Sequence, residues 1–105
     1  KLIVVLGHTK CGAIIGACDN IQMGNITSLL KKIQPAIEME TETTKDRHSN
    51  NRTFVKHVTI NNIFNVMQKI KEQSPILNEM ILQKKIKLVG GLYDLETGRV
   101  VFYEK

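Results

Sequence analysis

Two residues that commonly bind metal ions lie close together near the start of the chain. His8 and Cys11 are three positions apart in the stretch LIVVLGHTKCGAIIGAC, residues 2–18. Imidazole nitrogen and cysteine thiolate are preferred zinc donors, and a catalytic zinc site takes three protein ligands and one open position. The pair is therefore a candidate for part of a zinc site. Two alternatives stay open: a Cys11 nucleophile activated by His8, or an unrelated loop histidine and structural cysteine.

The other cysteine and histidines do not complete such a site. Cys18 lies seven residues after Cys11, which on a helix is about 10 Å away, so we expect a core thiol there. His48 lies in a polar stretch and should be exposed. His57 lies on a predicted helix with no partner ligand three or four residues away. We therefore expect the third ligand to lie outside these residues.

The glycines around His8 and Cys11 raise the question of whether this loop matches a phosphate-binding motif. Gly7 and Gly12 match the two glycines of a G-x-x-x-x-G loop, but Ala13 and Ile14 occupy the positions where that motif needs Lys and Ser or Thr. Thr9 likewise excludes the dinucleotide pattern G-x-G-x-x-G. Binding of a nucleoside triphosphate or a dinucleotide is therefore not expected.

Composition narrows the class of protein further. The chain has 105 residues and a formal charge of +5, but its lysines are scattered and only three arginines and five aromatic residues accompany them. Nucleic-acid binding needs a focused basic face, so we do not expect it. No apolar run approaches the roughly 20 residues of a membrane span. Two cysteines indicate metal or thiol chemistry rather than a disulfide.

Hydrophobic patterning predicts an α/β fold. Residues 2–6 are apolar on both faces, which predicts a buried strand and suggests that the chain begins partway through a larger domain. Residues 87–93 and 99–103 predict two further strands, antiparallel because only the turn 94–98 joins them. Gly98 should then have a positive φ. We expect a mostly parallel sheet with helices on both faces and an antiparallel C-terminal edge strand.

Apolar spacings of three and four residues predict helices in the first half of the chain. The loop at 7–11 should lead into a short helix at 12–18. A second, amphipathic helix is expected from Ile26 to Ile37, with Asn25 or Thr27 as its cap and a kink at Pro35.

The second half has clearer signals. The polar stretch ETETTKDRHSNN, residues 40–51, predicts a loop or an exposed helical link. A long helix is expected from Thr53 to about Gln73, and Phe54, Val58 and Ile63 should face the sheet. Ser74 and Pro75 suit the cap and first position of another helix. The buried side of that last helix is predicted to be Ile76, Leu77, Met80 and Ile81.

These segments resemble a known family. VVLGHTKCGA is similar to the second zinc-ligand motif of β-class carbonic anhydrases, an apolar strand followed by G-H-x-x-C-G-A. LVGGLYDLETGRVVF resembles the closing element of that family, and NNIFNVMQKI with SPIL fits the helices before it. The resemblance covers nearly the whole chain but only the second half of a family domain. Residues 1–105 are therefore interpreted as that half of a single domain.

The resemblance implies a zinc ion held by Cys, His and Cys, of which His8 and Cys11 match the second and third. The first cysteine belongs to a C-x-D-x-R motif, which also carries an Asp–Arg pair, and this motif is expected upstream of the chain. The implied activity is reversible hydration of carbon dioxide to bicarbonate in the complete protein, with the fragment alone inactive. The alternative is a non-catalytic zinc-binding or regulatory domain of the same fold.

Residues 34–51 carry a finer resemblance. Their composition is similar to that of carbonic anhydrase domains fused to bacterial sulfate-permease-type transporters. This similarity implies a cytoplasmic domain that is attached to a membrane anion transporter in some relatives. Family resemblance also implies a homo-oligomer, in the simplest case a dimer. Carbon dioxide and bicarbonate are the expected small-molecule partners.

Overall fold

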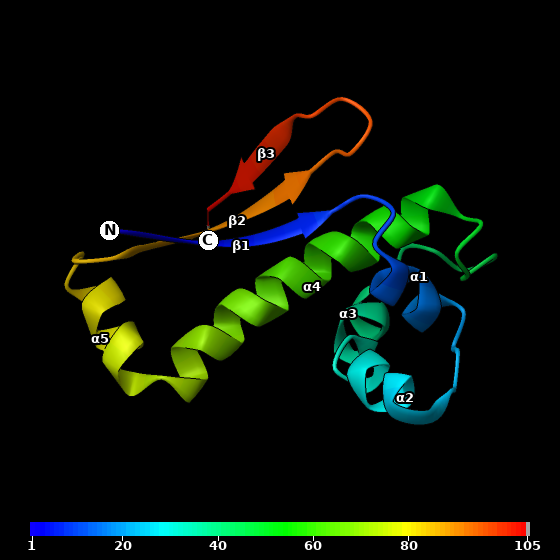
Figure 1. Ribbon diagram of the computed structural model, residues 1–105, viewed down its shortest axis with the longest axis horizontal. Helices are drawn as coiled ribbons and strands as arrows, with labels where there is room; N and C mark the ends of the chain where they lie inside the picture. The colour runs from blue at the N-terminus through cyan, green and yellow to red at the C-terminus, as the bar shows by residue number, and fades with distance from the viewer. Residues whose placement is uncertain (105) are drawn as a thin grey trace.

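The computed structural model describes residues 1–104, which form a three-stranded mixed sheet and the helices around it (Figure 1). The strands are β1 (Leu2–His8), β2 (Lys87–Tyr93) and β3 (Val100–Tyr103), in the order β1-β2-β3. β1 and β2 are parallel, with His8 opposite Tyr93, and β2 and β3 are antiparallel. The predicted α/β fold class, the mixed sheet and the C-terminal hairpin are confirmed, whereas the expected helices on both faces are not seen among residues 1–104, where α4 (Arg52–Gln73) packs on one face.

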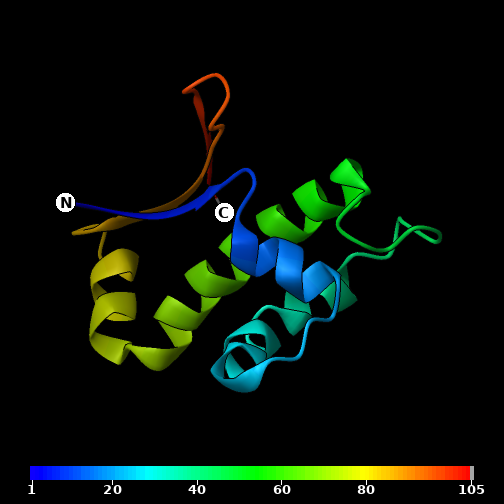
Figure 2. The ribbon, with the colours of Figure 1, turned by 45° about the vertical axis from the view of Figure 1, so that its right-hand side comes forward.

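The helices form two groups joined by one long helix. They are α1 (Gly12–Cys18), α2 (Gly24–Lys31), α3 (Gln34–Met39), α4 (Arg52–Gln73) and α5 (Pro75–Leu82). In Figure 1, α1, α2 and α3 gather beyond the C-terminal end of β1, and α4 runs from this group past the sheet to α5. Figure 2 shows the β2–β3 hairpin curling away from α4. Within residues 1–104, no helix combines the length and apolarity that a membrane crossing needs.

The helix predicted from Ile26 to Ile37 is wrong in one respect, because the structure divides it into α2 and α3. Pro35 lies in the first turn of α3. Its missing N–H costs nothing there, since the first helical amides have no partner within the helix. Proline therefore starts a new helix instead of bending an old one. The predicted caps are also wrong: Met23 precedes α2, and no side chain caps that helix.

In the second half, α5 begins at Pro75 as predicted, and α4 begins at Arg52, one residue before the predicted Thr53. The Asn51 side chain accepts a hydrogen bond from the Phe54 amide at the start of α4, and Ser74 Oγ accepts one from the Leu77 amide at the start of α5. The predicted buried side of α5 is wrong at Ile76, which is 75% exposed. Leu77, Met80 and Ile81 are half-buried, because α5 packs mainly against α4.

Two apolar clusters lie along α4. Phe54 and Val58 are fully buried, but they pack against α1, α2 and α3. The predicted burial is confirmed, whereas the expectation that both face the sheet is wrong. Ile63 and Met67 pack against the sheet, with Leu88 and Leu92 of β2. The first half of α4 therefore supports the helical group, and the second half supports the strands.

Glycines allow α4 to approach the sheet closely. A Cβ at Gly90 of β2 would lie 2.6 Å from Cγ2 of Ile63, and one at Gly7 of β1 would lie 2.8 Å from its Cδ1. Real Cβ atoms do not lie so close to other heavy atoms, so a side chain at either position would force Ile63 to move. The strand that leads to His8 is thus held directly against a buried helix.

The outer face of β1 corrects another expectation. Leu2, Val4 and Leu6 are 58%, 40% and 54% exposed, while Ile3 and Val5 pack in the cluster under the sheet. The strand predicted to be buried on both faces is therefore buried on one. In the described part of the chain α4 covers that one face, and β1 forms an edge of the sheet.

Candidate functional site

The two predicted metal ligands lie in one short loop. His8 is the last residue of β1, and Cys11 is the residue immediately before α1. Thr9 and Lys10 form the turn between them, and both candidate side chains are partly buried. This loop lies at the C-terminal end of a parallel strand, where open α/β sheets bind their ligands. From this position we expect the side chains of His8 and Cys11 to point into one pocket.

The ring of His8 has a defined hydrogen-bond partner. Its Nδ1 lies 2.7 Å from the carbonyl oxygen of Thr9. A carbonyl oxygen only accepts hydrogen bonds, so Nδ1 must carry the proton and donate it. The neutral ring then has its lone pair on Nε2, the nitrogen that remains for a metal ion. Metal-binding histidines use this arrangement, in which one ring N–H is held by an oxygen and the other nitrogen binds.

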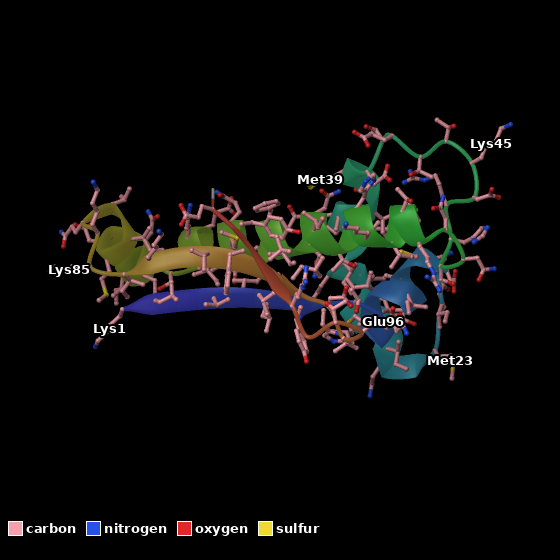
Figure 3. The ribbon with its side chains drawn as sticks, turned by 90° about the horizontal axis from the view of Figure 1, so that it is seen from above. Lys1, Met23, Met39, Lys45, Lys85 and Glu96 are labelled. Atoms are coloured by element: carbon pink, nitrogen blue, oxygen red, sulfur yellow. The ribbon has the colours of Figure 1, made fainter. Side chains whose placement is uncertain are left out.

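The β2–β3 hairpin holds the loop in place. The Thr9 amide donates to the Tyr93 carbonyl at 3.0 Å, and Thr9 Oγ1 accepts from the Leu95 amide at 3.0 Å. Lys10 Nζ lies 2.8 Å from Oε1 of Glu96, which Figure 3 labels at the end of the sheet. Lys10 has a φ of +56°, a left-handed conformation that costs energy for a residue with a side chain.

The hairpin turn itself has the predicted form. Gly98 has a φ of +76°, and its amide donates to the Asp94 carbonyl at 2.8 Å. The Thr97 hydroxyl accepts from the Arg99 amide at 3.2 Å. The bond between Gly98 and Asp94 closes the turn that contains Leu95 and Glu96.

The third ligand is not found in this part of the chain. Among residues 1–104, no group of three or more His, Cys, Asp or Glu side chains is placed to hold a metal ion. Cys18 is 7% exposed, as expected for a core thiol, and burial together with the charge of Asp19 raises its pKa to about 11. The thiol is therefore protonated at neutral pH, in keeping with a residue that packs in the apolar core. His8 and Cys11 have the donor chemistry of a zinc site but supply only two of its ligands.

A buried carboxylate is the polar group that the sequence did not reveal. The Glu40 side chain is 2% exposed, and its Oε2 lies 3.0 Å from Nδ1 of His57. It also accepts hydrogen bonds from the amide and the hydroxyl of Thr43. Burial by itself would raise the pKa of Glu40, but the bonds from Thr43 and His57 outweigh it and lower the pKa to about 2. Glu40 is therefore ionised.

Arg47 completes this group, which we call the Glu40 cluster: Glu40, Thr43, Arg47 and His57. The guanidinium donates to the carbonyls of Ile37, Glu40 and Thr43 and lies 4.7 Å from the ring centre of Phe54. It thus bonds carbonyls at and just beyond the C-terminal end of α3, where intrahelical partners run out. The expectation that His57 has no partner nearby on its own helix holds, but its partner comes from Glu40, 17 positions away.

The Glu40 cluster adjoins a cavity of about 250 Å³ whose lining includes Met39, Glu42 and Ile60. The Glu40 oxygens are already occupied by donors from the protein, so the cluster folds the polar loop and is not arranged to bind a ligand. An acidic residue at the end of a helix, with threonine three positions later, is the sequence signal for such a cluster. His48, expected to be exposed, has a side chain that is 46% exposed.

Comparison with known proteins adds evidence for the family. The family model described as carbonic anhydrase matches residues 1–100. The fold is similar to that of the β-carbonic anhydrase CcaA, with a TM-score of 0.78 and 18% identity, covering 97% of this chain and 46% of that one. A mutant of the β-carbonic anhydrase CafD of the filamentous fungus Aspergillus fumigatus is similar with a TM-score of 0.65 and 16% identity, covering 100% and 57%.

No curated protein matches the sequence. The chain spans 46% and 57% of the lengths of the two solved structures, so it corresponds to about half of such a fold. The family match nevertheless extends from the first residue through the hairpin, and it includes the loop of His8 and Cys11. The chain belongs to the carbonic anhydrase family.

Proposed function

We propose that the complete protein carrying this chain catalyses the zinc-dependent, reversible hydration of carbon dioxide to bicarbonate, with His8 and Cys11 as two of the zinc ligands. The observation that carries the proposal is the hydrogen bond from His8 Nδ1 to the Thr9 carbonyl. It leaves Nε2 available in the same loop as the partly buried Cys11 thiol, and it does so at the motif on which the family resemblance rests.

Each residue of the loop then has a distinct task. His8 binds as a neutral imidazole through Nε2, and its orientation is fixed by the Thr9 carbonyl. Cys11 binds as a thiolate through Sγ. When bound, zinc supplies a Lewis acid that makes hydroxide available from water near neutral pH. The hairpin contacts of Thr9 and Lys10 keep the loop in one conformation, which limits the reorganisation needed on binding.

We further propose that residues 1–105 are the second half of one domain. The exposed apolar face of β1, with Leu2, Val4 and Leu6, supports this, because monomeric proteins rarely leave contiguous apolar patches uncovered. The third ligand and the Asp–Arg pair come from the first half. The 105-residue chain alone is then expected to bind zinc weakly or not at all and to lack hydration activity.

The remaining features of the proposal concern the setting of the domain. A cytoplasmic homo-oligomer is proposed, free or as part of a membrane anion transporter. Two exposed apolar residues of the edge strand β3, Val101 and Phe102 at 55% and 61% exposure, support association through this edge. Sedimentation of the complete protein tests it, because Phe102→Lys should lower the oligomeric state, while Lys31→Glu, at an exposed position of α2, should not.

Zinc content and carbon dioxide hydration test the central proposal. In the complete protein, Cys11→Ser should lower zinc affinity by more than about 100-fold, beyond the range reported for residues that only support a ligand. Cys18→Ser is the matched control and should keep both zinc and activity, because Cys18 is a protonated core thiol. Loss of zinc from the Cys18 variant alone would contradict the assignment. Stoichiometric zinc without hydration would instead favour the non-catalytic domain.

A further inference from the structure

Thr9 uses three polar groups to connect three parts of the structure. Its carbonyl oxygen accepts from His8 Nδ1 at 2.7 Å. Its amide donates to the Tyr93 carbonyl of β2 at 3.0 Å. Its hydroxyl accepts from the amide of Leu95, 86 positions away, at 3.0 Å. One residue therefore links the ring of a proposed zinc ligand to the last pair of the β1–β2 ladder and to the hairpin turn.

The contact of the Thr9 hydroxyl lies just beyond the last residue pair of the β1–β2 ladder, where the hydrogen bonds of the sheet end. The β1–β2 ladder ends with His8 opposite Tyr93, and the chain then turns through Lys10 in a left-handed conformation with φ +56°. The peptide whose carbonyl orients His8 lies between these two points. On one side, the hydrogen bond from the Thr9 amide to the Tyr93 carbonyl fixes Thr9 to β2. On the other side, the hydrogen bond from the Leu95 amide to the Thr9 hydroxyl fixes it to the hairpin turn.

We propose that Thr9 is a positioning residue for His8, and that its hydroxyl holds the Thr9 carbonyl in the direction that fixes the His8 ring with Nε2 open to the metal. The inference rests on the proposed function of His8 as a zinc ligand. It also connects two segments that carry the family resemblance, GHTKCGA and YDLETG, because the second supplies the amide that holds the first. Partners that support metal ligands typically change metal affinity by about 10- to 100-fold when removed.

Two variants of Thr9 and one control separate positioning from simple stability. Thr9→Val keeps the shape but removes the acceptor, and Thr9→Ser restores it. Thr97→Val removes a hydroxyl that accepts a backbone amide, that of Arg99 at 3.2 Å, in the same hairpin without touching the loop. Zinc affinity of the complete protein is measured by competition with a chelator. The tautomer of His8 is read from its ¹⁵N chemical shifts in the zinc-free protein.

We expect Thr9→Val to lower zinc affinity by about 10- to 100-fold and to populate the tautomer with the proton on Nε2. Thr9→Ser should stay within about threefold of the unmodified protein, and Thr97→Val should leave affinity and tautomer unchanged. Unchanged affinity in Thr9→Val, or an equal loss in Thr97→Val, would overturn the proposal.

The unmodified protein provides a test that does not depend on any variant folding. Without zinc, His8 should carry its proton on Nδ1, and a predominant Nε2 proton would refute the proposal even if Thr9→Val is insoluble. Failure of the proposed function gives a different result. If the unmodified protein binds no zinc, or His8→Ala still binds it, the zinc assignment is wrong, while the tautomers of the Thr9 and Thr97 variants still decide the role of Thr9.

Discussion

In two histidines of this chain, the ring nitrogen Nδ1 lies within hydrogen-bond distance of an oxygen atom, but the surroundings of the two rings differ. His8 Nδ1 lies 2.7 Å from a backbone carbonyl, and His57 Nδ1 lies 3.0 Å from the buried carboxylate of Glu40. In both, the oxygen accepts and the ring is oriented. His8, however, ends a strand and shares its loop with a partly buried thiol. His57 lies on α4 among groups that already satisfy one another.

The difference shows that a bond between histidine and an oxygen does not by itself identify a metal site. The carboxylate beside His57 also accepts two bonds from Thr43, so it is committed to the fold of the polar loop. At His8 the oxygen belongs to the backbone, and no carboxylate is needed to orient the ring. What distinguishes the His8 loop is a second donor residue at the C-terminal end of a parallel strand.

The different roles assigned to His8 and His57 are tested most directly by removing each ring in turn. In the complete protein, His8→Ala should lower zinc affinity by more than about 100-fold, because it removes a proposed ligand rather than a supporting partner. His57→Ala should leave zinc bound and instead lower the free energy of unfolding by about 1–2 kcal/mol, since a hydrogen bond to a charged group is lost.

The measurements are metal content after dialysis and denaturant unfolding with each variant. If His57→Ala loses its zinc while His8→Ala keeps it, the roles assigned to the two histidines are reversed.

A second prediction concerns the packing that supports the strand of His8. Gly90→Ala should destabilise the protein by about 1–3 kcal/mol, the usual cost of overpacking, because its Cβ would lie 2.6 Å from Ile63 Cγ2 and 2.9 Å from Met67 Sδ. Gly12→Ala is the matched control within the loop region, since a Cβ there meets no described atom within 4 Å. Denaturant midpoints should fall for the first variant only. Equal losses would show that α4 does not press on the sheet as closely as described.

Much of this architecture could be predicted from the sequence because it depends on local signals. Gly12–Cys18, Lys87–Tyr93 and Pro75 as the start of α5 are found where they were expected. Each is marked by glycine, proline or a run of apolar residues, so nearby residues determine it. The loop at 7–11 was predicted in the same way, and β1 extends two residues into it, to His8.

The missed features depend on residues far apart in the chain. Burial of Glu40 requires His57 and Arg47 to approach it, and the bond between Thr9 and Leu95 spans 86 positions. A strand with two apolar faces also looks the same in sequence whether or not the chain supplies what covers it. The exposed face of β1 could therefore not be predicted from the residues of β1 alone.

The Glu40 cluster should be recognisable by its pH dependence. The pKa of Glu40 is about 2 in the folded protein against an ordinary value of 4.5. A group with a lowered folded pKa contributes stability that is fully present above its unfolded pKa and is lost as the pH falls through its folded pKa. The free energy of unfolding should therefore decline between about pH 4.5 and pH 2, and the decline should be shallower in Glu40→Gln.

Unfolding by urea at a series of pH values measures this difference. Glu42→Gln is the control, because the Glu42 side chain is 83% exposed and lies 3.9 Å from His57. A slope that changes equally in both variants would contradict the assignment of the acid sensitivity to the buried carboxylate.

The smallest expected effect comes from the other end of the polar loop. Asp19, which follows α1, accepts hydrogen bonds from the Ser49 hydroxyl and amide at 2.6 and 2.8 Å, and these bonds lower the pKa of Asp19. Unlike Glu40 it is exposed, so solvent competes for the same groups and the contact is screened. Asp19→Asn should therefore leave global stability almost unchanged and increase hydrogen exchange of the Ser49 amide, because the charge that strengthens its bond is gone.

The control is Asp46→Asn, which alters the charge of the same loop without removing a partner of Ser49. In this variant, hydrogen exchange of the Ser49 amide should match that of the unmodified protein. Equal acceleration in both variants would mean that loop charge, and not the bond to Asp19, protects this amide. A large loss of global stability in Asp19→Asn would mean that the exposed carboxylate of Asp19 stabilises the fold as much as the buried carboxylate of Glu40, which would contradict the distinction drawn between them.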